Sequence, residues 1–321
     1  MAAKKYLITG SSGFVGQHFL GFLEKQSPPA VVLGLDREPP HKRRTFRHLR
    51  FSFRSVDWQD FAKVKRILKQ FRPDYLLHLA SFSSISFSWR EPQLSFQNNT
   101  AIFLNLLEAV RQLKLTTRIL VVGSAEQYGR ARAVDLPLRE TLPLNPPSPY
   151  ACAKVAQELL AKIYVQGYGL KIILTRSFNH LGTGQKGAFA IPSFARQLIS
   201  LKKRHRSHGQ LLAGNLSSVR DFVDVRDVVR AYDLLLKRGR NGEVYNVCSG
   251  AGTPLKEVLE KMAGLCGVKI TVKIDPKLIR PTDVAVTVGH PGKIKKLGWA
   301  PTIPLEESLR DVLASWASSD G

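Results

Sequence analysis

Short apolar runs recur along the chain up to Asn179 and alternate with stretches of helical character. Between the first two runs, the stretch from Phe14 to Leu23 places its apolar side chains on one helical face. This alternation predicts an α/β fold, a Rossmann-like doubly wound parallel sheet covered by helices on both faces. The apolar runs are Tyr6–Thr9, Val31–Asp36, the alternating Leu49, Phe51 and Phe53, Tyr75–Ala80, Ile119–Val122 and Ile172–Leu174.

The regular pattern breaks up after Asn179, where glycines and Pro192 indicate irregular chain. A strand, helix and strand follow between residues 224 and 247, and we expect them to return to the first domain. The sequence therefore predicts a dinucleotide-binding domain from residues 1–178 together with 224–247. Residues 179–223 and 248–321 are expected to form a smaller α/β substrate-binding lobe.

The 321 residues carry a formal net charge of +23, concentrated in His41–Arg54 and Lys202–Arg206. Two solvated basic loops are the favoured interpretation of this excess. A surface that binds a polyanion and a field that draws in a phosphorylated substrate remain alternatives.

Apolar runs stay well short of the roughly 18 residues that a membrane span needs. The start of the chain leads directly into an apolar strand and shows no signal-peptide pattern. Cys152, Cys248 and Cys266 are scattered, lack the spacing of metal ligands and cannot all pair. A cytoplasmic protein without a bound metal is therefore expected.

Three glycines, Gly10, Gly13 and Gly16, join the first strand to the first helix. Glycine permits a tight turn and lets backbone N–H groups and the helix N-terminus approach a pyrophosphate. Asp36 ends the second strand, where an acid accepts hydrogen bonds from a ribose 2′-hydroxyl and repels a 2′-phosphate. NAD(H) is therefore favoured as cofactor, although the neighbouring Arg37 leaves NADP(H) possible.

Tyr150 and Lys154 lie four residues apart at the start of a predicted helix and share one face of it. Moving the pKa of a phenol from about 10 to 7 takes about 4 kcal/mol, and one cation at about 4 Å supplies about that much at an effective dielectric constant of about 20. Such pairs are common on helices, but Ser124 ends the fifth strand at the sheet edge where ligands bind. Ser124, Tyr150 and Lys154 are therefore the predicted catalytic residues, with Glu126 beside them.

Three motifs together resemble those of the extended short-chain dehydrogenase/reductases that act on nucleotide sugars. They are the glycine turn from Thr9 to Gly16, the serine four residues before Tyr128-Gly129, and the tyrosine and lysine at 150 and 154. Nearly the whole chain follows that family's order of motifs. The resemblance implies that Ser124, Tyr150 and Lys154 act in hydride transfer. It also implies that a dinucleotide contacts the glycines, Phe14, Val15, Asp36, Arg37, Asp57, Leu79, Ala80, Tyr150 and Lys154.

Later stretches resemble GDP-mannose 4,6-dehydratases and GDP-4-keto-6-deoxy-mannose reductases. They run from Arg176 to Gln185 and from Gly214 to Phe222, with an arginine-proline-x-acid turn at Arg280–Asp283. The likeness implies that Asn179, Ser124, Arg220, Arg280 and Asp283 contact the substrate, the two arginines holding its diphosphate. A guanidinium fork suits phosphate better than the point charge of lysine does.

Glu126 leaves two reactions open within this resemblance. A 4,6-dehydratase needs a carboxylate base, and Glu126 stands where the family places one. The string from Gly123 to Gly129 and the turn residues Ser11-Ser12 look more like the reductases. We therefore favour a reductase, in which Tyr150 protonates the oxygen formed at C4 of a GDP-4-keto-6-deoxyhexose.

Rival functions remain. The nearest are a 4,6-dehydratase or a 4-epimerase that acts on a GDP- or UDP-sugar. A more remote one is a reductase fold recruited to bind nucleic acid, which the positive charge permits but for which Tyr150 and Lys154 are not needed. The family likeness also suggests a homodimer through the helices that carry Asn99 and Tyr150, with no membrane span.

Overall fold

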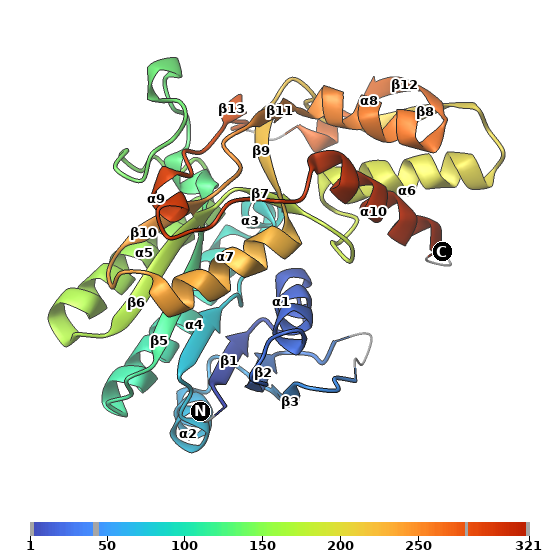
Figure 1. Cartoon of the computed structure of the whole chain (residues 1–321). Helices are drawn as coiled ribbons and strands as arrows, with labels where there is room; N and C mark the ends of the chain where they lie inside the picture. The colour runs from blue at the N-terminus through green and yellow to red at the C-terminus, as the bar shows by residue number, and fades with distance from the viewer. Residues whose placement is uncertain (1–2, 41–44, 280–281, 319–321) are drawn as a thin grey trace.

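A computed structural model describes residues 3–40, 45–279 and 282–318. A seven-stranded sheet forms its centre, and every neighbouring pair of strands in it is parallel (Figure 1). The predicted doubly wound parallel sheet is therefore confirmed. In spatial order its strands are β10 (Val244–Val247), β6 (Lys171–Ser177), β5 (Arg118–Ser124), β4 (Tyr75–His78), β1 (Lys5–Thr9), β2 (Val31–Asp36) and β3 (Arg50–Ser55).

Helices cover both faces of the sheet because the side chains of each strand alternate between two apolar cores. In β1, Leu7 belongs to one core while Tyr6 and Ile8 belong to the other. One face carries α2 (Phe61–Phe71), α4 (Pro92–Gln112) and α5 (Pro149–Tyr168), and the other carries α1 (Phe14–Glu24) and α7 (Val225–Arg238). Strands buried on both faces explain the nearly continuous apolar runs of the sequence.

The order of strands reverses beside β1, which lies between β4 and β2. The carboxyl ends of parallel strands meet at one edge of a sheet, and ligands bind at the point of reversal. Thr9, His78 and Ser124 end β1, β4 and β5 at that edge. The sheet therefore brings the glycine turn and the predicted catalytic serine to the same edge.

The remaining elements form a second group with an apolar core of its own (Figure 1). Its strands make two small sheets, one built around β9 and one made of β8 and β12. Pro192, expected in irregular chain, lies in the first turn of a helix, where the missing N–H of proline is tolerated. The elements are β7 (Asn179–Leu181), α6 (Ala190–Lys203), β8 (His208–Ala213), β9 (Val219–Asp224), β11 (Gly252–Pro254), α8 (Leu255–Cys266), β12 (Lys269–Ile274), β13 (Val286–Thr287) and α10 (Leu305–Ser318).

The strand from Val244 to Val247 adds to the outer side of β6 as the last strand of the main sheet. The chain thus leaves the sheet after β6, builds part of the second group and returns through α7. The roles expected for the two parts, cofactor binding and nucleotide-sugar binding, stay predictions. The remaining short elements are α3 (Ile85–Arg90), α9 (Gly292–Lys295) and the 3₁₀ turns η1 (Ala125–Tyr128), η2 (Ala133–Asp135) and η3 (Pro276–Leu278).

None of the helices within the described residues is both long and apolar enough to cross a membrane.

The basic stretch at the end of α6, Lys202–Arg206, is exposed throughout, as the interpretation of a solvated basic loop requires. Residues 41–44 of the other basic stretch lie outside the described residues, and its exposed members include Arg47, Arg50 and Arg54.

Candidate active site

Tyr150 and Lys154 project from the first turns of α5, beside the end of β5. The helix begins at Pro149, and the hydroxyl of Ser148 caps it by accepting a hydrogen bond from the N–H of Ala151. Both side chains are almost fully enclosed, with Tyr150 at 8% and Lys154 at 4% exposure. A phenol and an ammonium group are thus held together in a site from which most water is excluded.

Ser124 ends β5, and its side chain lies near the phenol of Tyr150. The Ser124 Oγ accepts a hydrogen bond from the backbone N–H of Glu126 at 3.2 Å. A side-chain hydrogen bond also joins Ser124 to the phenol of Tyr150. Since Oγ already accepts from Glu126, its own proton is available for Tyr150 or for a substrate oxygen.

Burial raises the pKa of Tyr150 to about 12, against the lowering effect of the Ser124 hydrogen bond, and the charge of Glu126 raises it further. The phenol is therefore protonated at neutral pH and suited to donate a proton. We expected Lys154 to bring the pKa of Tyr150 towards 7, and in this structure it does not. Desolvation of the buried phenol has the largest effect on its pKa, and Lys154 is not among the groups that shift it.

Lys154 makes its hydrogen bonds with uncharged groups. Its Nζ donates to the carbonyl oxygen of Val122 at 2.9 Å and to Oε1 of Gln157 at 3.2 Å, and it lies 5.9 Å from the centre of the Tyr150 ring. Burial lowers the pKa of Lys154 to about 8. Gln157 in turn donates to the backbone oxygen of Asn99 at 2.6 Å, which ties Lys154 to α4.

The glycine turn packs closely against the residues after β4 and against itself at the start of α1. Gly10 has a φ of +71°, and a Cβ there would lie 2.8 Å from the backbone nitrogen of Ala80. A Cβ on Gly16 would lie 2.5 Å from the oxygen of Gly10, while Gly13 starts α1 without a side-chain cap. The residues present therefore fit a pyrophosphate held at the N-terminus of α1.

Asp36 stands next to this turn at the end of β2. Its carboxylate accepts hydrogen bonds from the N–H of Ser12 at 3.0 Å and from the N–H of Arg37 at 2.8 Å. The Arg37 side chain turns away, donating to Asn98 at 2.6 Å and lying 5.4 Å from the centre of the Phe82 ring. An acid and an arginine thus border the same position, with the arginine drawn towards α4.

The other residues expected near the cofactor lie along the same edge. Thr9 Oγ1 accepts from the N–H groups of Leu79 and Ala80, each at 3.1 Å, which fixes the end of β4 against the glycine turn. Phe14 and Val15 begin α1. Asp57 lies farther out, exposed, in the loop after β3, where it accepts from the N–H of Gln59 at 3.0 Å.

The structure also brings together two of the predicted substrate contacts. The buried guanidinium of Arg220 donates to Asp283 at 3.0 Å, and Asn215 donates to the second oxygen of that carboxylate at 2.8 Å. Asn179 is exposed on β7, which pairs with β9, the strand of Arg220. Arg280 lies outside the described residues.

Sequence reasoning missed two glutamines of the site, Gln127 and Gln157. Gln127 accepts a hydrogen bond from the backbone N–H of Ser124 at 2.8 Å and completes a capping box at the start of η1. A serine followed three residues later by glutamine is the recognised signature of that motif, so the signal was present. Gln157 gave no such signal beyond lying one helical turn after Lys154.

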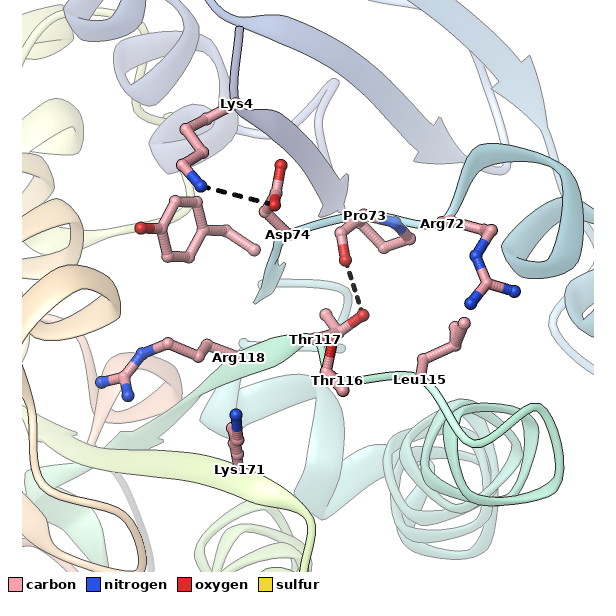
Figure 2. A pocket seen from close by; sticks show the side chains of 10 residues that line it. Lys4, Arg72, Pro73, Asp74, Leu115, Thr116, Thr117, Arg118 and Lys171 are labelled. Carbon is pink, nitrogen blue, oxygen red and sulfur yellow. Dashed lines mark hydrogen bonds and ion pairs between the residues drawn. The ribbon is translucent and has the colours of Figure 1, made fainter. Parts of the chain in front are cut away.

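A separate hollow of about 240 Å³ lies at the opposite edge of the sheet, where the strands begin (Figure 2). Arg118, one of its cations, donates to the carbonyl oxygens of Leu236 and Gly239 at 2.7 and 2.6 Å and so caps the end of α7. Lys4 pairs with Asp74 there. These contacts give Arg118 and Lys4 structural roles, while Arg72 and Lys171 also line the hollow. Within the described part of the chain, no group of three or more His, Cys, Asp or Glu side chains is placed to hold a metal ion.

Comparison with known proteins agrees with this geometry. Residues 7–312 match the family described as GDP-mannose 4,6 dehydratase. The GDP-6-deoxy-D-mannose reductase of Pseudomonas aeruginosa is 32% identical over 98% of both chains, and the GDP-mannose 4,6-dehydratase of Yersinia enterocolitica is 26% identical over 97% of this chain and 93% of its own.

Solved structures resemble the chain over nearly its whole length. RMD from Pseudomonas aeruginosa, complexed with NADPH, has a TM-score of 0.85 and 30% identity over 98% of this chain and 99% of its own. The UDP-glucose 4-epimerase of Thermus thermophilus, in complex with NAD, has a TM-score of 0.85 and 30% identity over 98% of this chain and 100% of its own. The chain therefore belongs to the GDP-mannose 4,6-dehydratase family of extended short-chain dehydrogenase/reductases.

Proposed function

We propose that this protein is an NAD(P)H-dependent reductase that acts on the C4 ketone of a GDP-4-keto-6-deoxyhexose. The observation that carries the proposal is the Ser124–Tyr150–Lys154 site in a chain 32% identical over 98% of its length to a GDP-6-deoxy-D-mannose reductase. The general conclusion, an oxidoreductase of nucleotide sugars, rests on family membership. The identity of the sugar rests on this one relative.

The cofactor proposed is NAD(H), with NADP(H) as the alternative. A bound nicotinamide dinucleotide would supply the hydride. The turn of Gly10, Gly13 and Gly16 at the N-terminus of α1 would hold its pyrophosphate, and Asp36 offers a carboxylate to the adenosine ribose. NADPH and NAD are both found in similar proteins, so the balance between Asp36 and Arg37 decides the preference here.

Tyr150 is the proposed proton donor to the C4 oxygen. Its high pKa keeps the phenol protonated, and the Ser124 hydroxyl lies close enough to hydrogen-bond the same oxygen. The Lys154 ammonium stabilises negative charge that forms on the phenol once its proton has left. The enclosure of both side chains strengthens these interactions, because little water remains to screen them.

A 4,6-dehydratase is the second candidate, and Glu126 is the observation that favours it. The charge of Glu126 raises the pKa of Tyr150, so this carboxylate lies near the reacting phenol, where a base for the C5 proton would be needed. A 4-epimerase, which returns the hydride to the same carbon, needs no such base. Of the three reactions, only the reduction consumes reduced cofactor.

A panel of GDP-, UDP-, dTDP- and CDP-sugars, including 4-keto-6-deoxy forms, tests the proposal. A reductase oxidises added NADH or NADPH only with a 4-keto sugar, in amounts equal to the sugar consumed. A dehydratase or epimerase converts its sugar without net oxidation of the cofactor. If none of the GDP-linked 4-keto sugars causes oxidation of NADH or NADPH, the proposed substrate is refuted.

The arginines of the second group of elements are proposed to hold the diphosphate. Arg220 is buried and already oriented by Asp283, so its guanidinium is fixed in place before a substrate arrives. Asn179 lies on the neighbouring strand β7. Under this proposal, residues 179–223 and 248–321 bind the nucleotide sugar, and residues 1–178 with 224–247 bind the cofactor. A cytoplasmic location is part of the same proposal.

A homodimer through α4 and α5 is also proposed. These two helices pack side by side, and their outer faces expose Leu104, Leu159 and Ile163, the last two at 53% and 56%. Ile102 and Phe103 face the core instead. A second copy would cover the exposed apolar face. Sedimentation of wild type and Ile163→Asp tests this: a dimer should become a monomer, and a monomeric wild type would refute it.

A further inference from the structure

A buried ion pair joins α5 to the neighbouring strand directly beneath the candidate site. The carboxylate of Glu158 accepts from Nη2 of Arg176 at 2.8 Å and from Nε at 3.0 Å, and both side chains are only 3% exposed. Glu158 lies one helical turn after Lys154, and Arg176 lies on β6. The fork geometry fixes the carboxylate in both position and orientation.

Gln127 connects this ion pair to the catalytic loop. Its Nε2 donates to Oε2 of Glu158 at 2.9 Å, and its Oε1 accepts from the N–H of Ser124 at 2.8 Å. The Gln127 side chain is completely buried. One amide therefore links the helix of Tyr150 to the residue that hydrogen-bonds the Tyr150 phenol.

Gly123 leaves the space through which this link passes. A Cβ at position 123 would lie 2.4 Å from Oε1 of Gln127 and 2.3 Å from the backbone oxygen of Thr175. The guanidinium of Arg176 also lies 4.7 Å from the centre of the Tyr128 ring, at the far end of η1. Both ends of the short turn that carries Glu126 are thus fixed by the same ion pair.

Stability alone does not account for such an arrangement. A buried ion pair is costly to desolvate, and well-packed apolar side chains of similar volume often give equal or greater stability. Burial opposes the ionised form of Glu158, but hydrogen bonds from Arg176 and Lys162 outweigh it and hold the pKa of Glu158 below its usual value. A charged, oriented acceptor is therefore maintained at the position where Gln127 needs it.

We propose that Gln127, oriented by the Glu158–Arg176 pair, is a positioning residue that sets the place of the Ser124 hydroxyl relative to Tyr150. This inference rests on the proposed function, since it assigns Gln127 a part in the same reaction. Gln127 itself touches neither the phenol nor the substrate position. It acts through the backbone N–H of Ser124.

The test replaces Gln127 with methionine, which has a similar shape and cannot make either hydrogen bond. For Gln127→Met we expect kcat to fall by about tenfold to a hundredfold, because displacement of a reacting group by about 1 Å has effects of that size. The KM for the cofactor should change less than about twofold, since the glycine turn is untouched. Gln127→Ala repeats the measurement if the methionine variant folds poorly.

A double-mutant cycle separates positioning from general damage. If Gln127 acts through Ser124, then adding Gln127→Met to a Ser124→Ala enzyme should change kcat by less than about twofold. The matched control is Lys237→Met, which removes the partly exposed partner of Asp233 on α7 and leaves Gln127, Glu158 and Arg176 untouched. It should keep wild-type kcat.

Two results overturn the inference while the proposed function stands: full kcat in Gln127→Met, or an equal loss of kcat with and without Ser124. Failure of the wild type to reduce any sugar would instead refute the proposed function. The positioning claim is then decided by crystal structures of wild type and Gln127→Met. An unchanged distance between Ser124 Oγ and Tyr150 Oη would refute it.

Discussion

The ammonium nitrogen of Lys154 lies 5.9 Å from the centre of the Tyr150 ring and donates a hydrogen bond to the carbonyl oxygen of Val122. Burial acts on the two groups in opposite directions, raising the pKa of Tyr150 to about 12 and lowering that of Lys154 to about 8. Each shift favours the uncharged form. Lys154 is therefore placed to stabilise the phenolate that forms when Tyr150 loses its proton, and the lysine cation then gains an anionic partner.

Replacing Tyr150 with phenylalanine should abolish turnover while sparing the cofactor site. Loss of the proton donor lowers kcat by about 10² to 10⁴-fold. The glycine turn and Asp36 are unaffected, so the affinity for NADH, measured by fluorescence titration, should stay within about threefold of wild type. Wild-type turnover by Tyr150→Phe would remove the basis for the proposed chemistry.

Replacing Lys154 with methionine should leave the protein at least as stable as the wild type at pH 7 although it is inactive. The folded-state pKa is lowered from 10.5 to about 8, so the unfolded chain binds this proton more tightly than the folded chain. This difference in proton binding destabilises the folded protein by about 3 kcal/mol below about pH 8. The destabilisation decreases as the pH rises towards 10.5. Lost hydrogen bonds to Val122 and Gln157 offset part of the gain.

Urea unfolding of Lys154→Met and wild type across this pH range measures the effect. The free energy of unfolding of the wild type should rise relative to that of the variant between pH 8 and 10.5. A difference that does not vary with pH would mean that Lys154 titrates normally in the folded protein.

Replacing Asp36 with alanine should weaken NADH binding more than NADPH binding. The variant loses a carboxylate acceptor for the ribose hydroxyls, worth about tenfold to a hundredfold in affinity, and it also loses repulsion of a 2′-phosphate. The exposed Asp74 at the opposite edge of the sheet offers a control, and Asp74→Asn should bind both cofactors as the wild type does. Equal losses for the two cofactors in Asp36→Ala would show that Asp36 does not select between them.

Replacing Glu126 with glutamine distinguishes reduction from dehydration. A reductase needs no base at C5, so kcat should stay within about threefold of the wild type, whereas loss of a catalytic base lowers it by about 10² to 10⁴-fold. Incorporation of solvent deuterium at C5 provides the second measurement. Exchange in the wild type that disappears in Glu126→Gln would identify a dehydratase.

The sheet could be predicted from sequence because its strands are buried on both faces and read as apolar runs. The glycine turn and Asp36 could also be predicted from sequence as cofactor-site residues, since their chemistry depends on local spacing. The pKa of Tyr150 was not predictable, because it depends on how completely the folded chain excludes water from α5. The Glu158–Arg176 pair joins residues that no local pattern connects, and its role appears only when β6 lies beside the helix.

The structure of segments that begin a helix or a turn was harder to predict from sequence. Pro192 suggests irregular chain, yet in the first turn of α6 proline is compatible with a helix. Arg37 follows Asp36 in sequence and suggested tolerance of a 2′-phosphate. Its side chain instead reaches Asn98 and Phe82, a contact between distant segments that sequence spacing cannot show.

The last strand of the main sheet has a consequence for synthesis of the chain. Until Val244–Val247 has been translated, β6 remains the outermost strand, with the apolar run Ile172–Leu174 and one unpaired row of backbone groups. A nascent or truncated chain that stops short of β10 would therefore expose an unpaired strand edge at which other chains can pair. Soluble expression of fragments should depend sharply on whether they extend past Val247.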